Sequence, residues 1–366
     1  MLETVRKFRR DVGRVRDEGP PKVMFWAIIN HCNAVCTSCS FYLVPRAEKT
    51  HCDLAEAKRA IATLARSNFR LVSLTGGEPL MHPQFFDICD EINRQGIEVS
   101  YVPTNGLLID DETARRLKSV RAKVVGLSIE PIEANGMGAT RKIRDFRNVL
   151  ARAIAALNRH GVSTYGGILL SKATRDIHKT MQFAQELGFT KVSFSYPQLE
   201  QRSTYIASRR IPEIDLTAEE IEEMVSAIKA AKRDFPKVAI YNTDESLDDL
   251  ARFYRGEPRR FPCWGGKKLF YMDWKLDLYP CFTLGRKYGN LLEMERIEVE
   301  EEGLCDLCTQ QAFRDFGPLF AGISAVSDAL VQIGRAHPLL AARRVMEPDA
   351  RAGMHSLLEV YRGGFV

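Results

Sequence analysis

The feature that most constrains the fold is a regular alternation of short apolar runs with amphipathic segments through the first half of the chain. The runs are rich in β-branched and aromatic residues, and they predict buried strands at residues 23–29, 70–74, 97–102, 123–128, 162–169 and 191–195. Between them, apolar residues recur at helical spacing, as in Leu54, Ile61 and Leu64. Strands that alternate with helices predict an α/β fold with a parallel sheet and right-handed crossovers.

Three cysteines in the pattern CxxxCxxC, namely Cys32, Cys36 and Cys39, follow the first predicted strand. The loop that leaves this strand therefore carries all three thiols. Three thiolates can hold three irons of a [4Fe–4S] cube and leave the fourth iron open to a small molecule, whereas a cube that only transfers electrons normally has four cysteines. The alternatives are a zinc site completed by His31 and a group of ordinary core cysteines.

The cysteine motif resembles the signature of radical S-adenosylmethionine (SAM) enzymes. Residues 75–79, Thr-Gly-Gly-Glu-Pro at the end of the second strand, resemble the second motif of that superfamily. In the family such a strand–helix series is a partial (β/α)6 barrel of TIM-like form, open on one side for the substrate. An aromatic residue commonly precedes the third cysteine, where this chain has Ser38. Phe41 and Tyr42 lie just beyond and are the alternatives for contact with the adenine, with Tyr42 in the expected set.

The other expected SAM contacts lie where the predicted strands end, because ligand sites of parallel α/β folds lie at the carboxyl ends of the strands. The resemblance implies that Cys32, Cys36 and Cys39 bind the cluster, and that Gly77 and Glu78 meet the methionine amino group. It also implies ribose or carboxylate contacts from polar residues on the later strands. The complete expected set is Gly76, Gly77, Glu78, Asn105, Ser128, Glu130, Ser171, Tyr42 and Arg144, with Arg141 as the alternative to Arg144 for the SAM carboxylate.

A second set of cysteines, Cys263, Cys281, Cys305 and Cys308, has the spacing C-x17-C-x23-C-x2-C. A β-hairpin is predicted between the first two, with strands at 269–272 and 276–280. Four thiols can fill every site of a tetrahedral zinc ion or of a second cube. The arrangement resembles the short "Twitch" extension of SPASM-related radical SAM enzymes, which implies an auxiliary [4Fe–4S] cluster, with zinc as the alternative.

The domain organisation follows from these motifs. A basic leader (1–21) precedes the barrel (22–212), which is followed by a helix and linker (213–262), the auxiliary iron–sulfur extension (263–312) and an amphipathic helical tail (313–366). A capping box at Thr217 and Glu220 opens the helix, while residues 244–262, rich in charge and turn formers, predict the linker. An apolar stripe followed by arginines runs through the tail, which predicts a helix packed on the barrel or a basic helix lying on a membrane surface.

Composition limits the cellular context. The chain has 366 residues, a net charge of +5 and nine cysteines. Clustered cysteines without a recognisable signal peptide predict a cytoplasmic, reducing environment and metal binding. No motif for nucleic acid accompanies the basic leader, so no nucleic-acid partner is expected. No apolar run is long enough to span a bilayer without a charge or a Pro or Gly break, which leaves only peripheral membrane contact as a hypothesis.

The resemblance implies an enzyme that reductively cleaves SAM to methionine and a 5′-deoxyadenosyl radical, which takes a hydrogen atom from a substrate C–H bond. An electron donor such as flavodoxin or ferredoxin is implied as a partner. A fully ligated auxiliary cluster favours an oxidation or a bond formation. A small-molecule or lipid-like substrate is the first hypothesis, because the leader is short for a folded peptide-binding domain. A maturase that modifies peptides or proteins and a non-catalytic iron–sulfur scaffold are the alternatives.

Overall fold

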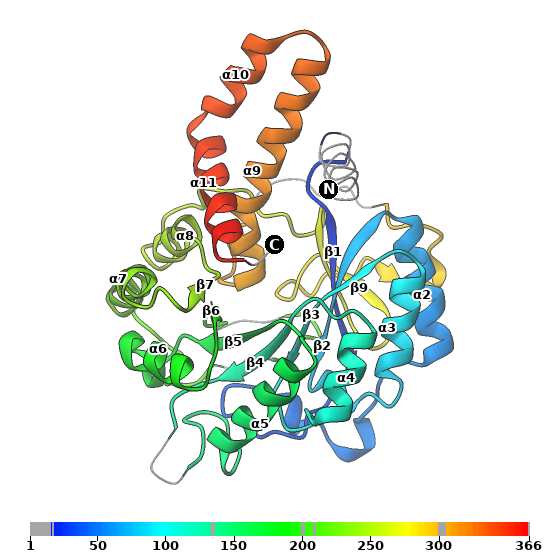
Figure 1. The fold of residues 1–366 in the computed structure, drawn as a ribbon. Helices are drawn as coiled ribbons and strands as arrows, with labels where there is room; N and C mark the ends of the chain where they lie inside the picture. Colours follow the sequence, from blue (N-terminus) through cyan, green and yellow to red (C-terminus); the bar gives the residue numbers. More distant parts are fainter. Residues whose placement is uncertain are drawn as a thin grey trace.

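The fold is built on one curved sheet. A computed structural model describes residues 16, 18–132, 136–198, 202–207, 210–298 and 305–364. Among these residues, ten strands form a sheet in the order β10-β9-β8-β1-β2-β3-β4-β5-β6-β7. Neighbours from β1 to β7 are parallel, and so are β8 and β1, whereas β9 and β10 are added antiparallel. Helices cover the outside of this sheet (Figure 1), so the predicted partial TIM-like barrel is confirmed.

The strands are β1 (Lys22–Ile29), β2 (Phe69–Gly76), β3 (Glu98–Thr104), β4 (Val125–Ile129), β5 (Thr164–Leu169), β6 (Lys191–Ser195), β7 (Ala239–Ile240), β8 (Leu269–Met272), β9 (Asp277–Tyr279) and β10 (Gly289–Asn290). The helices are α2 (Leu54–Arg66), α3 (Phe85–Arg94), α4 (Asp111–Ser119), α5 (Phe146–Arg159), α6 (Ile177–Glu186), α7 (Ala218–Asp234), α8 (Asp244–Tyr254), α9 (Gln311–Gly334), α10 (Pro338–Met346) and α11 (Pro348–Arg362). All six strands predicted for the barrel and the hairpin of β8 and β9 are therefore present.

Strand β1 is buried on both faces, as expected of a parallel strand. Met24, Trp26 and Ile28 belong to the core under the helices, whereas Phe25 and its neighbours at positions 23 and 27 face a second core on the inner side of the sheet. The second core includes Phe282 of the extension and Phe313 of α9. The extension and the tail are therefore continuous with the barrel.

The prediction of a linker at 244–262 is wrong for residues 244–254. Residues 244–254 form α8, which begins where the Thr243 side chain accepts a hydrogen bond from the Ser246 amide. Its acidic first turn suits a helix N-terminus, and Leu247 and Leu250 are buried. Of the charges that suggested a linker, Asp248 is exposed and Asp249 is buried, while the other charged residues of this helix are half-buried. The capping box predicted for Thr217 and Glu220 is confirmed at the start of α7.

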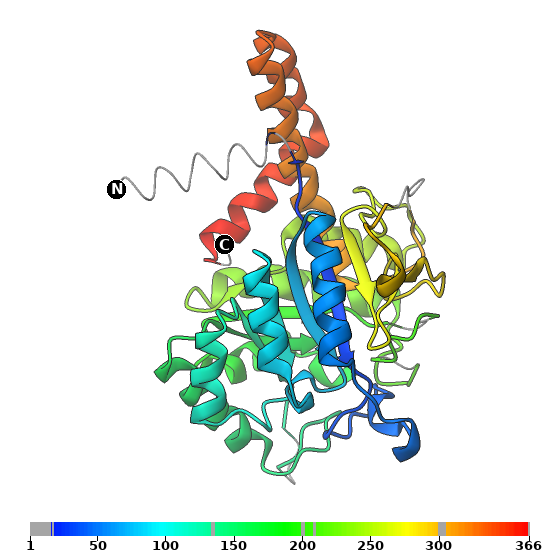
Figure 2. The same cartoon turned by 90° about the vertical axis from the view of Figure 1, so that its right-hand side faces the viewer.

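The tail forms a helical hairpin in which α9 runs away from the barrel and α10 and α11 return. Figure 2 shows this hairpin projecting from the end of the barrel opposite to the segment around residues 40–50. Of the described helices, α9 alone is long and apolar enough to cross a membrane, judged by length and composition only. Its first turns are buried against the barrel, with Phe313, Leu319 and Phe320 in the inner core. Most of the basic leader, residues 1–15 and 17, lies outside the described residues.

Candidate active site

The three thiols of the first cysteine motif lie on the loop that leaves β1. The Ala34 amide lies 3.4 Å from the Cys32 sulfur and the Asn105 side-chain amide lies 3.6 Å from it, both as donors. The thiolate forms of Cys32, Cys36 and Cys39 would repel one another electrostatically, so the three thiols lie within electrostatic range of one another. The loop therefore collects the three thiols into one site.

The thiols are chemically suited to a metal centre. Burial raises the pKa of Cys32 to about 11 and that of Cys39 to about 12, and burial also raises the pKa of Cys36. Three thiolates that repel one another are stabilised by a positively charged partner, and iron supplies one. Nitrogen–hydrogen donors aimed at sulfur suit an iron–sulfur cluster as well, because such bonds stabilise its negative charge. The residues present thus fit the cluster.

The glycine pair after β2 packs against the entrance of the cysteine loop. A Cβ atom on Gly76 would lie 2.3 Å from the Ile29 carbonyl oxygen, and one on Gly77 would lie 2.0 Å from that of His31. Gly76 also has a φ of +137°, which disfavours a side chain. The Gly77 amide donates to the Ile29 carbonyl and the Glu78 amide to that of His31, both at 3.1 Å. Glycine is required here because two backbones are in contact.

The Glu78 carboxylate is buried and holds the end of β3. It accepts hydrogen bonds from the Thr104 hydroxyl at 2.9 Å, the Asn105 amide at 2.9 Å and the Leu80 amide at 3.2 Å. Burial raises the pKa of Glu78 to about 7, and these donors oppose the rise. A carboxylate has about four acceptor positions, so one remains for an ammonium group. The contact between Glu78 and the methionine amino group stays a prediction.

Glu130 lies at the end of β4 and anchors the segment that follows it. Its carboxylate accepts hydrogen bonds from the amide and hydroxyl of Thr140 and from the amide of Arg141. A Cβ atom on Gly138 would lie 2.2 Å from a carboxylate oxygen of Glu130, so this segment passes very close to it. Three or more of its acceptor positions are thus used within the protein.

The anchored segment pairs with the cysteine loop. The Thr37 amide donates to the Thr140 carbonyl at 2.9 Å and the Lys142 amide to the Val35 carbonyl at 2.8 Å, which makes Cys36 and Arg141 antiparallel partners. We call residues 138–142, held by Glu130, the clamp. No local sequence pattern indicates this pairing, because it joins two loops that are far apart along the chain.

The two arginines considered for the SAM carboxylate differ in position. Arg141 of the clamp is largely buried, lies 3.2 Å from the Glu130 carboxylate and interacts electrostatically with all three thiols. Arg144, the first choice from the sequence, is exposed. The structure therefore brings Arg141 rather than Arg144 to the cysteine loop.

The remaining predicted contacts are spread along the same end of the barrel. Asn105 donates to the Asn33 side chain at 2.8 Å, and Ser128 lies opposite Gly167 of β5. Ser171 is buried and hydrogen-bonded to Thr174 as part of a cap. Tyr42 is half-buried, whereas its neighbour Phe41 is buried and packs edge-on against Tyr205 at 5.6 Å.

The second cysteine set also converges. The Gly265 amide donates to the Cys263 sulfur at 3.4 Å, and the Thr283 and Leu284 amides donate to the Cys281 sulfur at 3.4 and 3.3 Å. Cys263 interacts electrostatically with Cys305 and Cys308, and burial raises the pKa of Cys281 to about 12. The electrostatic interactions that link the four thiols, and the amide donors to two of them, are those expected of a fully ligated metal centre.

Two buried arginines that the sequence analysis did not single out hold the backbone of the second cysteine set. Arg259 donates to the Cys305 carbonyl at 3.4 Å, and Arg314 donates to the Cys308 carbonyl at 2.9 Å. Both guanidinium groups face the buried carboxylate of Asp249 in α8, at 3.8 and 2.5 Å. A sequence signal existed, because Arg314 interrupts the apolar stripe of the tail.

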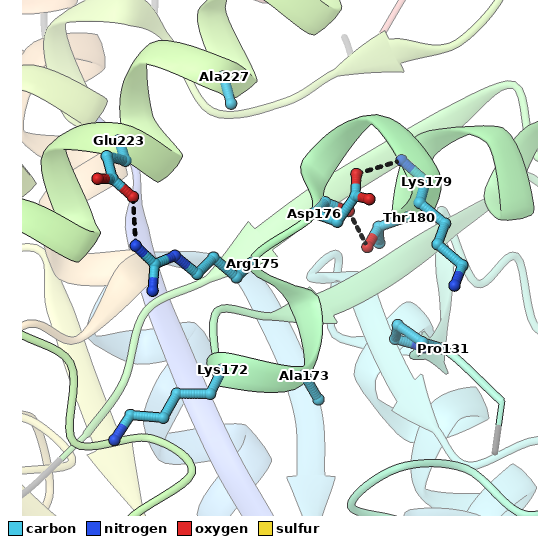
Figure 3. Close-up of a pocket in the computed structure, with 9 residues that line it drawn as sticks. All are labelled: Pro131, Lys172, Ala173, Arg175, Asp176, Lys179, Thr180, Glu223 and Ala227. Carbon is cyan, nitrogen blue, oxygen red and sulfur yellow. Dashed lines mark hydrogen bonds and ion pairs between the residues drawn. The ribbon is translucent and has the colours of Figure 1, made fainter.

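A separate basic pocket of about 570 Å³ lies beside Pro131, between the turn after β5 and the helices α6 and α7 (Figure 3). Lys172, Arg175 and Lys179 line it, and Arg175 is paired with Glu223 at 2.6 Å. None of the cysteines or expected SAM contacts lines this pocket. It is therefore distinct from the site formed by the three thiols.

Comparison with known proteins agrees with the fold and the thiol site. Residues 26–184 match the family model described as the Radical SAM superfamily. They include the cysteine loop and the glycine turn, so this part of the chain is a radical SAM domain. The family uses a [4Fe–4S] cluster and SAM.

Three curated relatives share parts of the sequence. The Fe-coproporphyrin III synthase of Methanosarcina barkeri is 25% identical over 231 residues, which cover 60% of this chain and 55% of that protein. The AdoMet-dependent heme synthase of the same organism is 30% identical over 173 residues, with coverages of 46% and 48%. The PqqA peptide cyclase of Gluconobacter oxydans is 21% identical over 256 residues, with coverages of 68% and 65%. The chain spans about half the length of the first two.

Among solved structures, Streptococcus suis SuiB bound to S-adenosylmethionine is similar in fold. The TM-score is 0.58 at 15% identity, and the match covers 88% of this chain and 73% of SuiB. The coverage extends beyond the radical SAM domain, which agrees with the continuity of the barrel and the extension.

Proposed function

We propose that this protein is a radical SAM enzyme that generates a 5′-deoxyadenosyl radical and removes a hydrogen atom from a small-molecule or lipid-like substrate. The observation that carries this proposal is the convergence of Cys32, Cys36 and Cys39 beside the glycine turn of β2. Three thiol ligands leave one iron of a cube without a protein ligand, as SAM binding requires.

The cluster, when bound, supplies the electron that splits the sulfonium of SAM into methionine and the radical. The residues of the chain itself hold and orient SAM. Gly76 and Gly77 allow the backbones of β2 and the cysteine loop to meet, while Glu78 presents a remaining acceptor position to the methionine ammonium. Arg141, fixed by Glu130, offers a guanidinium to the SAM carboxylate in place of the exposed Arg144. Asn105, Ser128, Ser171 and Tyr42 remain proposed SAM contacts.

The second cysteine set is proposed to hold an auxiliary [4Fe–4S] cluster. Four thiols and several amide donors support a centre whose metal sites are all filled by protein. Such a centre has no position for a substrate and suits electron transfer. The overall reaction is thus proposed to be an oxidation or a bond formation that ends in loss of an electron.

The substrate class is drawn from the relatives. Two of them are named for heme and Fe-coproporphyrin III, which supports a small molecule. Flavodoxin or ferredoxin is the proposed electron donor, and the exposed Val35 and Leu43 beside the thiols leave an apolar surface for it.

Formation of 5′-deoxyadenosine tests this proposal. Anaerobically reconstituted protein is incubated with SAM and dithionite, and the nucleoside is measured by chromatography. Intact protein is expected to form it, and Cys36→Ala is expected to form none. The matched control is Cys89→Ala, a buried cysteine of α3 outside both cysteine sets, which is expected to retain the activity. No product from intact protein would contradict the proposal and support a non-catalytic scaffold.

A second candidate function is modification of a peptide or protein. The similarity to a protein named PqqA peptide cyclase, over 68% of this chain, favours it. A gene for a short precursor peptide beside the gene for this chain would support a maturase. Neighbouring genes of small-molecule or lipid metabolism would support the first candidate.

A further inference from the structure

The tail hairpin is rigidly attached at its base. Gln311, at the start of α9, hydrogen-bonds to Ser193 at 2.6 Å and Ser195 at 3.0 Å of β6. Higher up, α9 and α11 touch through their backbones, because a Cβ atom on Gly322 would lie 2.6 Å from the carbonyl carbon of Gly353. The hairpin therefore holds its far end at a fixed place away from the barrel (Figures 1 and 2).

The far end of the hairpin, residues 333–346, is here called the tip. Every residue from 333 to 340 is exposed. The exposed fractions of its large apolar side chains are 58% for Ile333, 84% for Leu339, 51% for Leu340 and 63% for Met346. Single exposed apolar residues are ordinary, but several gathered on one projecting end mark a contact surface.

The charged side chains of the tip are all arginines. Between Ala329 and Met346 the sequence has no Asp or Glu, whereas it has Arg335, Arg343 and Arg344. Arg344 is paired with both Asp328, at 2.9 Å, and Glu347, whereas Arg335 and Arg343 are exposed. Arg16, the first described residue of the leader, contacts α9 before the tip, because the Ser327 hydroxyl donates to the Arg16 carbonyl at 3.1 Å.

We propose that the tip binds the surface of an anionic phospholipid bilayer. The apolar side chains would enter the boundary between headgroups and acyl chains, while the exposed Arg335 and Arg343 meet lipid phosphates. The protein would bind peripherally, since Arg314 and Asp315 near the start of α9 are buried in bonds to the barrel. A second copy of the chain fits less well, because a narrow tip buries little against the roughly 1,000 Å² that a specific protein interface needs.

Co-sedimentation with vesicles tests the proposal, using full-length protein with its clusters. Intact protein is expected to bind vesicles that contain phosphatidylglycerol, and to bind phosphatidylcholine vesicles more weakly. The double substitution Leu339→Glu and Leu340→Glu is expected to weaken binding to the anionic vesicles at least about ten-fold. Leu358→Glu is the matched control, because Leu358 is 51% exposed but lies on α11 beyond the tip. It is expected to bind like intact protein.

Two further measurements make each outcome decisive. Formation of 5′-deoxyadenosine by the double variant shows that it is folded, and light scattering without vesicles shows whether the tip joins two copies. The proposal is overturned if intact protein stays in the supernatant with anionic vesicles, or if the double variant binds as well as intact protein. It is also overturned if intact protein is a dimer that the double substitution converts to a monomer.

Discussion

Glu130 illustrates how one carboxylate can organise a functional loop. It is almost fully buried, and it holds the clamp through Thr140 and Arg141. Replacing it by Gln puts an amide donor against groups that already donate, and it removes the charge that faces Arg141. Glu130→Gln is therefore expected to lower the free energy of unfolding by about 2–4 kcal/mol.

Chemical denaturation under anaerobic conditions checks this value. Asp111→Asn is the matched control, because Asp111 also pairs with an arginine, Arg159, at 2.8 Å, but both side chains are exposed. A surface pair contributes about 0–1 kcal/mol. Equal losses in the two variants would show that Glu130 does not anchor the clamp.

Asp315 gives the protein a predicted pH dependence. Burial raises its pKa to about 6, although it accepts hydrogen bonds from Tyr196 at 2.6 Å and Gln311 at 2.9 Å. The folded state therefore binds this proton more tightly than the unfolded state, and the stability contributed is lost as pH rises through the folded pKa. From about pH 5 to about pH 7.5, intact protein should lose roughly 1 kcal/mol of unfolding free energy relative to Asp315→Asn.

Denaturation of both proteins across this pH range provides the measurement. Asp90→Asn, which changes an exposed carboxylate on α3, serves as the control and should follow intact protein. A constant difference between intact protein and Asp315→Asn at every pH would contradict the assignment.

Helix α8 shows how an element can support a site that it does not contain. Asp249 lies buried between Arg259 and Arg314, and these arginines hold the carbonyls of Cys305 and Cys308. Asp249→Ala leaves two buried guanidinium groups without their carboxylate. It is expected to cost about 3–5 kcal/mol of unfolding free energy and to lower the iron content.

Asp248→Ala provides the matched control for this element. Asp248 is the preceding residue of α8, and its carboxylate is exposed and pairs with Lys229 at 2.6 Å. A loss of less than about 1 kcal/mol is expected. If Asp249→Ala is as stable as this control and keeps its iron, the buried triad does not hold the second cysteine set.

Helices α9 and α11 pack closely at Gly322 and Gly353. A Cβ atom on Gly353 would lie 2.4 Å from the Gly322 amide nitrogen, so Gly353→Ala must push the helices apart. A cost of about 1–3 kcal/mol is expected in thermal or chemical unfolding. At Gly334, the last residue of α9, no neighbouring atom lies within 4 Å of a Cβ, so Gly334→Ala should be neutral or slightly stabilising. Equal stability of the two variants would rule out close helix packing.

Local sequence patterns were enough to predict the barrel strands, the hairpin of the extension and the position of the first cysteine motif on the loop after β1. Periodicity and spacing within short segments carry that information. The pairing of β8 with β1 and of the clamp with the cysteine loop was not predictable, because each joins segments remote in sequence. The same limit explains the missed helix α8. Its charged residues resemble a linker until it is known that Asp249 is buried between Arg259 and Arg314.

At the scale of the whole molecule, the barrel and the extension share one sheet, and the helical tail joins them in a continuous inner core. Phe25 of β1 packs against Phe282 of the extension at 5.3 Å and against Phe313 of α9 at 5.6 Å. The proposed SAM site, the second cysteine set and the hairpin are thus fixed relative to one another. This arrangement suits an enzyme in which electrons pass between two centres and the tip sets the orientation at a surface.

The central claim is that Cys32, Cys36 and Cys39 hold a cluster with one iron left for SAM. Electron paramagnetic resonance of the dithionite-reduced protein, recorded with and without SAM, tests it most directly. A cluster signal is predicted to change on addition of SAM, to persist in Cys281→Ala and to disappear in Cys36→Ala. A spectrum that SAM leaves unchanged, or a SAM-sensitive signal that survives in Cys36→Ala, would contradict the claim.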